Sequence, residues 1–363
     1  MKTAIIHDWL TNMGGAEQVV INFKEIYPDA PIYTTFYNPN NLDEKLKNID
    51  VKTCFLQKNK LITNHKKYFP FMPLAFENFD LNNYDVVLSS SSSCAKGVLT
   101  KPGSIHFCYC HTPMRYAWEK RDEYIEGMGK LKRGLIKILL HYMRIWDVAS
   151  ANRVDYFIAN STEVQKRIKK HYKRDSIVIN PPVRCSLFDI SENDGDYYIV
   201  VSRLVKYKRF DLAVQACKEL GRKLIIIGDG PEKENLQKIA EGCNNIQFLG
   251  RLSDPEVKKY MAEAKALLFP GEEDFGITPV EAMASGRPVI AYGKGGVLDS
   301  VVDGKTGVLF EEQAVESLKE AILKFENMQF NKDEIRQHAL KFDVEEFKKK
   351  VKEFIDKKVY ENK

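Results

Sequence analysis

One stretch decides the fold class of this chain: Phe269-Pro-Gly-Glu-Glu-Asp-Phe-Gly-Ile-Thr-Pro-Val-Glu-Ala-Met-Ala-Ser-Gly-Arg-Pro-Val-Ile-Ala291. The apolar run that ends at Phe269 predicts a strand, and a glycine- and acid-rich turn leads from it into a helix that starts near Pro279. Glu273 lies in the turn, and Glu281 follows eight positions later in the expected first turn of the helix. Because the free backbone N–H groups of a helix start bind anions, the pattern indicates a phosphate-bearing ligand whose hydroxyl groups meet carboxylates.

Short apolar runs alternate with helical patterns along the rest of the chain. Strand and helix in alternation predict parallel sheets built from βαβ units, and 363 residues are more than one hydrophobic core usually serves. We therefore expect an α/β protein of two domains. The expected strands are Thr3–His7, Tyr84–Ser89, Ser104–Cys110, Tyr156–Asn160, Tyr197–Ser202, Lys223–Gly228, Asn245–Leu249, Ala266–Phe269 and Pro288–Tyr292.

The clearest break between the domains is Asn180-Pro-Pro-Val-Arg184. Its two prolines remove two N–H donors and favour extended backbone, so neither a helix nor a central strand continues there. We place the first domain at residues 1–182 and the second at 183–342. Residues 343–363 carry apolar side chains at helical spacing among lysines, and we expect this C-terminal helix to pack back on the first domain.

Composition narrows the function. The chain has 55 Lys and Arg against 50 Asp and Glu, a net charge of +5, and because acids are interleaved with the bases a nucleic-acid binder is disfavoured. No apolar run reaches the ~18 residues of a membrane span, and the first strand begins at Thr3 without a secretory signal pattern. The seven scattered cysteines lack metal spacing, which favours reduced thiols in the cytoplasm and no metal site.

The carboxylates of the opening stretch allow two interpretations. Thr278-Pro-Val-Glu281 fits a capping box, with Thr at the N-cap and Glu at the third helical position, and Glu273 would then be a solvated loop acid. Alternatively, both glutamates bind a ligand. Gly271 and Gly276 enclose three acids, and acids crowd together in this way when hydroxyl groups or cations are their partners.

A basic turn follows the strand that ends near Ser202. Open parallel sheets bind ligands at the carboxyl ends of their strands, where Arg can hold a phosphate with two hydrogen bonds and Lys adds a point charge. We therefore expect a diphosphate clamp here, with a solvated surface turn as the alternative. The cations are Arg203, Lys206, Lys208 and Arg209.

Two glycine turns also follow predicted strands. Gly228-Asp-Gly230-Pro231 has Lys at position 233 in place of the third glycine of a dinucleotide fingerprint, and the turn at Gly14 and Gly15 departs from that fingerprint too. A nicotinamide-dependent oxidoreductase is therefore disfavoured. Glycines at these places allow close approach of a ligand to the backbone, and plain turns are the alternative.

His111 follows a predicted strand in Cys110-His-Thr-Pro-Met-Arg-Tyr-Ala-Trp118. We expect it to face the crevice between the domains, where the aromatic residues of the same loop would stack on the apolar face of a sugar. A purely structural histidine is the alternative.

Two segments combine basic with apolar side chains, as segments that lie on membranes do. In Lys130–Trp146 a stripe of cations runs beside a broad apolar arc at helical spacing, and Lys58–Met72 mixes lysines with aromatic residues. We expect both to contact an anionic membrane surface. The alternative is a helix and a loop that pack on the domain and leave a solvated basic face.

Together these motifs resemble glycosyltransferase family 4, retaining enzymes of the GT-B fold, over nearly the whole chain. The sharpest marker is the pair Glu273 and Glu281 with seven residues between them. Ser202–Arg209 resembles the basic strand end of the family, and His7–Val20 resembles its N-terminal glycine loop. His111–Glu119 resembles more narrowly the WbaZ-like bacterial mannosyltransferases of surface polysaccharide assembly.

This resemblance implies two Rossmann-like parallel-sheet domains that face a central crevice, the first binding the acceptor and the second the nucleotide-sugar donor. It implies transfer of a hexose, with mannose from GDP-mannose favoured, to a polyprenyl-linked saccharide. The enzyme would be cytoplasmic and bound peripherally to the inner face of the cell membrane. No metal or other cofactor is implied, because Arg and Lys neutralise the diphosphate. The alternatives are a UDP-sugar-dependent enzyme of the same fold and a non-catalytic nucleotide-sugar-binding protein.

The resemblance also implies roles for single residues. Two side chains border the transferred sugar and two cations neutralise the diphosphate, which gives the catalytic set Glu273, His111, Arg203 and Lys208. Glu281 would accept hydrogen bonds from the ribose hydroxyl groups. The other donor-binding residues are Gly276, Ile277 and Thr278 through their N–H groups, Arg209 through its charge, and Gly14 and Gly15 along the crevice.

Overall fold

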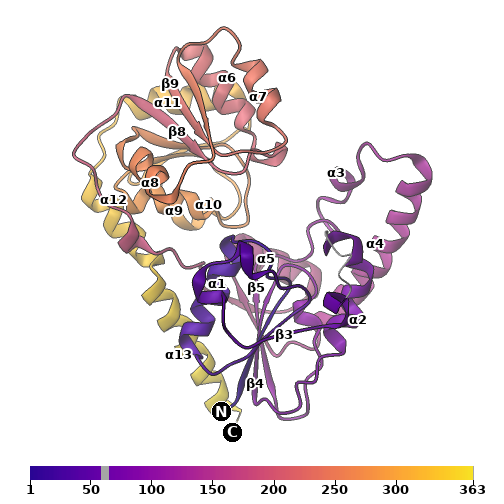
Figure 1. The fold of residues 1–363 in the computed structure, drawn as a ribbon. Coiled ribbons are helices and arrows are strands. Elements are labelled where there is room, and N and C mark those ends of the chain that lie inside the picture. The colour runs from indigo at the N-terminus through magenta and orange to yellow at the C-terminus, as the bar shows by residue number, and fades with distance from the viewer. Residues whose placement is uncertain (59–64, 363) are drawn as a thin grey trace. The chain divides into compact units, whose positions relative to one another are not determined.

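The computed structural model describes residues 1–58 and 65–362 (Figure 1). The chain forms two compact units. Unit 1 comprises Met1–Pro181 together with Phe347–Lys363, and unit 2 is Pro182–Glu346. Each unit contains one all-parallel sheet with helices packed against it, so the fold is α/β with two Rossmann-like sheets, as the sequence predicted.

In unit 1 the strands lie in the order β3-β2-β1-β4-β5-β6-β7, and every neighbouring pair is parallel. Every residue of the central strands β1 and β4 is buried, which is why these strands are predicted by continuous apolar or small-residue runs. The strands are β1 (Thr3–His7), β2 (Ile32–Thr34), β3 (Val51–Thr53), β4 (Val86–Ser91), β5 (Ile105–Cys110), β6 (Tyr156–Ala159) and β7 (Ser176–Val178).

The helices of unit 1 follow the strands along the chain, and the last helix of the protein completes the unit. They are α1 (Gly15–Ile26), α2 (Met72–Glu77), α3 (Arg121–Ile125), α4 (Lys130–Ala151), α5 (Thr162–Tyr172) and α13 (Val344–Glu361).

Helix α13 lies beside α1 (Figure 1). Its buried face consists of Phe347, Val351 and Ile355, which belong to the same apolar cluster as Phe23 and Tyr109. The ring of Phe347 lies 6.0 Å from that of Phe23 and 5.7 Å from that of Tyr109. The amphipathic stripe of the C-terminal residues is therefore buried on unit 1.

In unit 2 the strands lie in the order β10-β9-β8-β11-β12-β13, again with every neighbouring pair parallel. The strands are β8 (Tyr197–Val201), β9 (Lys223–Ile227), β10 (Ile246–Gly250), β11 (Ala266–Phe269), β12 (Val289–Tyr292) and β13 (Gly307–Phe310). The helices are α6 (Phe210–Leu220), α7 (Lys233–Ile239), α8 (Asp254–Glu263), α9 (Ile277–Ala284), α10 (Val297–Ser300), α11 (Val315–Glu326) and α12 (Lys332–Ala339).

The nine strands predicted from the sequence are all present. Four described strands were not predicted, namely β2, β3, β7 and β13, and each has only three or four residues. Strands this short cannot show a period, and three of them form the sheet edges, where side chains such as those of β3 are largely exposed.

Both sheets have a switch point, where the strand order changes direction. It lies between β1 and β4 in unit 1 and between β8 and β11 in unit 2. The loops that leave these strands at their carboxyl ends diverge, and open α/β sheets bind their ligands there. We therefore expect a ligand-binding site in the loops after β1, β4, β8 and β11.

At the switch point of unit 1, Asp8 occupies the position where an anion would bind. The residue is 2% exposed, and its carboxylate accepts hydrogen bonds from the backbone N–H groups of Ser92–Ala95 at 2.7–2.9 Å. The hydroxyl of Ser92 adds a fifth bond at 3.1 Å. This carboxylate therefore joins the loops after β1 and β4 and satisfies four backbone donors that would otherwise lack an acceptor.

We expect Asp8→Ala to lower the free energy of unfolding of unit 1 by about 3–5 kcal/mol, because it leaves several buried donors without an acceptor. Urea unfolding followed by tryptophan fluorescence measures this, since all three tryptophans lie in unit 1. Asp43→Ala is the control: that carboxylate accepts one hydrogen bond, from Lys45 N on the surface, and its loss should cost about 1 kcal/mol or less. Equal losses in the two variants would contradict this role of Asp8.

Candidate functional site

The acidic turn lies at the switch point of unit 2, between β11 and α9. The helix begins at Ile277, and Gly276 precedes it with φ +86°, a conformation that favours glycine. The predicted capping box is therefore wrong: Thr278 is the second helical residue, Glu281 is the fifth, and no side chain caps the helix. The positive φ of Gly276 turns the chain into the helix earlier than the Thr-Pro pair suggests, and Pro279 fits the first turn because N–H groups there need no intrahelical acceptor.

The start of α9 presents open backbone donors. The N–H groups of Gly276, Ile277 and Thr278 donate to no acceptor within residues 1–58 and 65–362. Together with the positive end of the helix dipole they form an arrangement that binds anions. The helix starts two residues earlier than expected, and the three proposed donor-binding N–H groups lie at its N-cap and first turn.

Glycines fix the acidic turn between two neighbouring loops. A Cβ on Gly271 would lie 2.8 Å from the Cα of Lys208, in the loop after β8. On the other side, a Cβ on Gly295 would lie 2.5 Å from the carbonyl oxygen of Glu273, and Gly296 donates its N–H to the same oxygen at 2.9 Å. Gly295 and Gly296 were not among the predicted site residues, although a pair of glycines shortly after the predicted strand β12 indicates a close backbone contact there.

The basic turn after β8 divides into paired and unpaired cations. Lys208 Nζ lies 2.7 Å from Glu273 Oε1, and both side chains are mostly buried, 12% and 19% exposed. The guanidinium of Arg209 binds the carboxylate of Asp211 at 3.0–3.2 Å. Arg203 is exposed and has no hydrogen-bond or ion-pair partner in the part of the chain that the structure describes. Its charge is therefore the one in this set that is free to meet an anion.

Glu281 lies half-buried on α9, and its carboxyl group makes no hydrogen bond with the described residues. Burial and, to a smaller extent, the carboxylate of Asp254 raise the pKa of Glu281 from 4.5 to about 7, against the opposing effect of Lys258. A carboxylate that is removed from water without a partner is costly, and hydroxyl groups of a ligand would relieve that cost.

The glycines of the turn after β9 allow close contact with the protein's own backbone. A Cβ on Gly228 would overlap the carbonyl oxygen of Ser202, and one on Gly230 would overlap that of Leu204. Leu204 N also donates to Asp229 O at 3.0 Å. The close backbone approach expected at these glycines is thus made by the loop after β8.

In unit 1 the predicted residues gather around its own switch point. Gly14 is the extended N-cap of α1 and Gly15 its first residue, while His111 directly follows β5. Nε2 of the half-buried His111 lies 2.8 Å from the hydroxyl of Ser90, and burial lowers the pKa of His111 to about 3. Ser90 was not predicted as a site residue, because it lies within a run of serines that has no pattern of its own.

The aromatic residues of the loop after His111 pack inside unit 1. The indole N–H of Trp118 donates to Asp147 at 2.8 Å, and its ring stacks on His171 at 4.4 Å. The hydroxyl of Tyr116 lies 2.7 Å from that of Ser93. These contacts account for the aromatic residues of the loop without a sugar.

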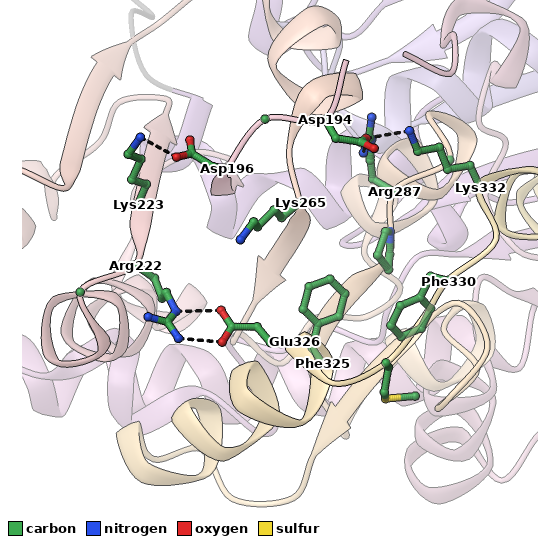
Figure 2. Close-up of a pocket in the computed structure, with 15 residues that line it drawn as sticks. Asp194, Asp196, Arg222, Lys223, Lys265, Arg287, Phe325, Glu326, Phe330 and Lys332 are labelled. Carbon is green, nitrogen blue, oxygen red and sulfur yellow. Dashed lines mark hydrogen bonds and ion pairs between the residues drawn. The ribbon is translucent and has the colours of Figure 1, made fainter. Parts of the chain in front are cut away.

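A cavity of about 770 Å³ lies at the opposite edge of the unit 2 sheet (Figure 2). Its lining includes residues that precede the strands, and its cations face carboxylates: Arg222 binds Glu326 at 2.7 Å and Lys223 binds Asp196 at 2.6 Å. None of the predicted site residues lines it. Its size therefore does not make it the candidate site.

Two protein-family models match the chain side by side. The model described as Glycosyltransferase Family 4 matches residues 13–187, and the model described as Glycosyl transferases group 1 matches residues 188–342.

Among curated relatives, the chain is 32% identical over 201 residues to an uncharacterized glycosyltransferase of Methanocaldococcus jannaschii, which covers 54% of this chain and 55% of the relative. It is 31% identical over 140 residues to a GDP-mannose-dependent alpha-(1-6)-phosphatidylinositol monomannoside mannosyltransferase of Mycobacterium tuberculosis, which covers 34% and 36%. The matches thus span about half and about a third of the relatives' own lengths.

Among solved structures, Anabaena HepE in complex with UDP-glucose superimposes with a TM-score of 0.72 at 18% identity, over 98% of this chain and 100% of the other. At this identity the likeness establishes the fold alone, two Rossmann-like sheets of the GT-B kind.

The raised pKa of Glu281 has a consequence for stability. Between about pH 4.5 and pH 7 the folded protein retains a proton that the unfolded chain releases, so the free energy of unfolding falls as pH rises, by up to about 3 kcal/mol. Glu281→Gln has no such proton, and we expect its stability relative to wild type to increase across this window and to level off above it. Urea unfolding followed by circular dichroism from pH 4 to pH 8 measures the difference.

Glu256→Gln serves as the control. Hydrogen bonds from Ser253 lower the pKa of Glu256, so its contribution is lost only as pH falls below the usual carboxyl range. It should show no change between pH 4.5 and pH 7. A Glu281→Gln curve parallel to wild type over the same window would refute the raised pKa.

Proposed function

The chain belongs to the glycosyltransferases described as group 1 and family 4, and from this membership we propose that it is a retaining hexosyltransferase that uses a nucleotide-sugar donor. One observation carries the proposal: at the switch point of unit 2, the loops after β8 and β11 and the helix α9 bring together open N–H groups, an unpaired Arg203 and the two glutamates of the motif. Unit 2 would bind the donor, and unit 1 would bind the acceptor.

The donor diphosphate fits the cations and the helix start. Arg203 supplies an unpaired charge, Lys208 a charge already fixed by Glu273, and Gly276, Ile277 and Thr278 supply backbone N–H groups. Negative charge builds on the diphosphate as the bond to the sugar breaks, so donors fixed in place before reaction stabilise the transition state most. Arg209, whose charge Asp211 balances, would add a weaker attraction.

The two glutamates suit the hydroxyl-bearing ends of the donor. Glu281, half-buried and without a partner among the described residues, would accept hydrogen bonds from the ribose. Glu273, held in place by Lys208, would face the transferred sugar. His111 of unit 1 would border the same sugar, and Gly14 and Gly15 would line the acceptor side.

The reaction proceeds with retention at the anomeric carbon. The bond between C1 and the diphosphate oxygen breaks, and the acceptor hydroxyl oxygen bonds to C1 on the same face. The proton of that hydroxyl passes to the departing phosphate oxygen. Because the leaving group takes this proton, no pair of acid and base carboxylates of the glycosidase kind is required.

For the donor we propose GDP-mannose, with a polyprenyl-linked saccharide of bacterial surface polysaccharide synthesis as acceptor. The name of the Mycobacterium tuberculosis relative supports GDP-mannose, and the resemblance of His111–Glu119 to WbaZ-like mannosyltransferases supports the acceptor class. The UDP-glucose bound to the structurally similar HepE supports the alternative, a UDP-sugar-dependent enzyme.

A thermal-shift panel of GDP, UDP, ADP and their hexose conjugates tests the donor. We expect stabilisation by GDP and GDP-mannose alone, because ligands that bind only the folded state raise its melting temperature. In Arg203→Ala, turnover of the active donor should fall about a hundredfold, the effect of removing one fixed donor to the developing charge.

Lys265→Ala, an exposed lysine at the cavity on the opposite sheet edge, is the matched control and should behave as wild type. A shift with UDP species instead would replace the mannose assignment by the UDP-sugar alternative. Full turnover in Arg203→Ala would remove the diphosphate clamp.

We further propose that α4 contacts an anionic membrane surface. Leu131, Leu135, Ile138, Tyr142 and Ile145 follow one another at helical spacing and are each more than half exposed. The same segment, from residue 130 to residue 146, carries five Lys and Arg and no acid. Apolar insertion and about 1 kcal/mol for each cation near anionic lipid would favour binding.

Part of the predicted apolar arc of α4 packs inside unit 1 and is not available to a membrane. Leu139 and Trp146 pack against the apolar cluster of unit 1, so the exposed stripe is narrower than the sequence suggested. The second predicted segment, Lys58–Met72, lies partly outside the described residues, which omit 59–64. Within the described residues no helix is both long and apolar enough to cross a membrane.

Flotation with liposomes containing anionic lipid at low salt tests the α4 surface. The double variant Leu131→Glu/Leu135→Glu should lose binding, because it places two charges where apolar side chains would insert. Leu323→Glu changes an exposed leucine on α11 of unit 2 and should bind as wild type does. The membrane proposal would be wrong if the wild-type protein did not float with the liposomes, or if the α4 double variant and Leu323→Glu bound the liposomes equally.

A further inference from the structure

Four side chains of unit 1 form a continuous line to His111. Glu17 Oε1 lies 3.5 Å from His7 Nε2, His7 Nδ1 lies 3.1 Å from Ser90 Oγ, and Ser90 Oγ lies 2.8 Å from His111 Nε2. His7 ends β1, Ser90 lies on β4 and His111 follows β5, so the line crosses the three neighbouring strands at the switch point. The residue types in this line are those that fix the proton of a histidine.

Because this line of hydrogen bonds is buried, each of its protons can be accepted only by a neighbouring group of the protein. His7 and Ser90 are 2% and 0% exposed, so water does not compete for their hydrogen bonds. His7 Nδ1 also lies 3.2 Å from the carbonyl oxygen of Ser90, which can only accept, so Nδ1 carries a proton. The contact of His7 Nε2 with Glu17 Oε1, at 3.5 Å, is longer than an ordinary N–H···O hydrogen bond and does not decide the tautomer of His7. The Ser90 hydroxyl therefore accepts from His7 and directs its own proton to His111.

This assignment determines the tautomer of His111. Its pKa, lowered to about 3 by burial and by His7, keeps the ring neutral with a single N–H group. Since Nε2 accepts the proton of Ser90, the N–H must lie on Nδ1. Nδ1 makes no hydrogen bond in the part of the chain that the structure describes, and it is not among the buried unsatisfied atoms there, so it can donate to a ligand.

We propose that Ser90, oriented by His7, is a positioning residue that fixes His111 as the tautomer with its proton on Nδ1 and so presents a hydrogen-bond donor to a hydroxyl of the transferred sugar. The sugar contact rests on the proposed function, whereas the tautomer does not. Gly14 belongs to the same arrangement, since a Cβ there would lie 3.1 Å from Glu17 Oε2 at the far end of the line.

The sheet supplies an internal control for this arrangement. Ser89 Oγ lies 2.8 Å from His106 Nε2, the same pair of groups at the same distance on the opposite face of the sheet. His106 is fully buried and its Nδ1 has no partner, so this second pair leads to no ligand position. Removing the Ser89 hydroxyl deletes its hydrogen bond with His106, whereas removing the Ser90 hydroxyl deletes its contacts with both His7 and His111.

Histidine-selective ¹⁵N labelling and long-range ¹H–¹⁵N spectra measure the tautomer directly in the full chain. We expect His111, assigned with His111→Gln, to carry its proton on Nδ1 in wild type and to become a mixture of tautomers in Ser90→Ala. Ser89→Ala should change only the signals of His106. A proton on Nε2 of His111 in wild type, or tautomers unchanged in Ser90→Ala, would overturn the proposal whether or not any sugar nucleotide turns over.

Kinetics with the donor found by the nucleotide panel test the sugar contact. Ser90→Ala should lower kcat on the order of tenfold with little change in donor KM, because only the fraction of enzyme with the donor tautomer reacts. Ser90→Thr, which keeps the hydroxyl, should restore the tautomer and the rate, and Ser89→Ala should keep the rate of wild type. A changed tautomer with an unchanged kcat would overturn the sugar contact.

Discussion

The candidate donor site depends on one constraint, the contact of backbone with backbone at the carboxyl edge of the unit 2 sheet. Gly271 lies against Lys208 on one side, and Gly295 and Gly296 lie against the carbonyl groups of the acidic turn on the other. Any side chain at these glycines would push the loops apart. Because the loops touch through their backbones, the Lys208–Glu273 pair and the start of α9 are held in fixed places without a ligand.

The two switch points differ in what their backbone N–H groups bind. Both sheets direct backbone N–H groups toward the carboxyl ends of central strands, where they need an acceptor. In unit 1 the carboxylate of Asp8 is that acceptor, and it satisfies four N–H groups within the protein. In unit 2 the N–H groups at the start of α9 stay open. A phosphate-bearing donor therefore suits unit 2, while unit 1 offers hydrogen-bonding groups such as His111 for a neutral partner.

The strands of the fold could be predicted from the sequence more completely than the roles of individual residues. Buried parallel strands of four to six residues are apolar runs, so nine strands could be found, whereas three of the four missed strands have only three residues, too few to show a period. Glu273, Arg203 and Lys208 could be proposed from their position after strands. The start of α9 could not, because it depends on the positive φ of Gly276. Nor could Ser90, because its function follows from the strand register that sets it beside His7 and His111.

The same reasoning separates structural from functional polar groups in unit 1. Strand β4 carries consecutive serines whose side chains alternate between the faces of the sheet, so Ser89 and Ser90 meet different histidines. Each pair leaves one histidine nitrogen without a protein partner: on one face it is buried in the core, and on the other it lies at the switch point on a half-buried residue. A buried polar pair costs stability unless all its groups are satisfied. His106 Nδ1 is sealed in the core, whereas Nδ1 of the half-buried His111 is open to a ligand, as are the N–H groups at the start of α9 and the carboxyl group of Glu281 in unit 2.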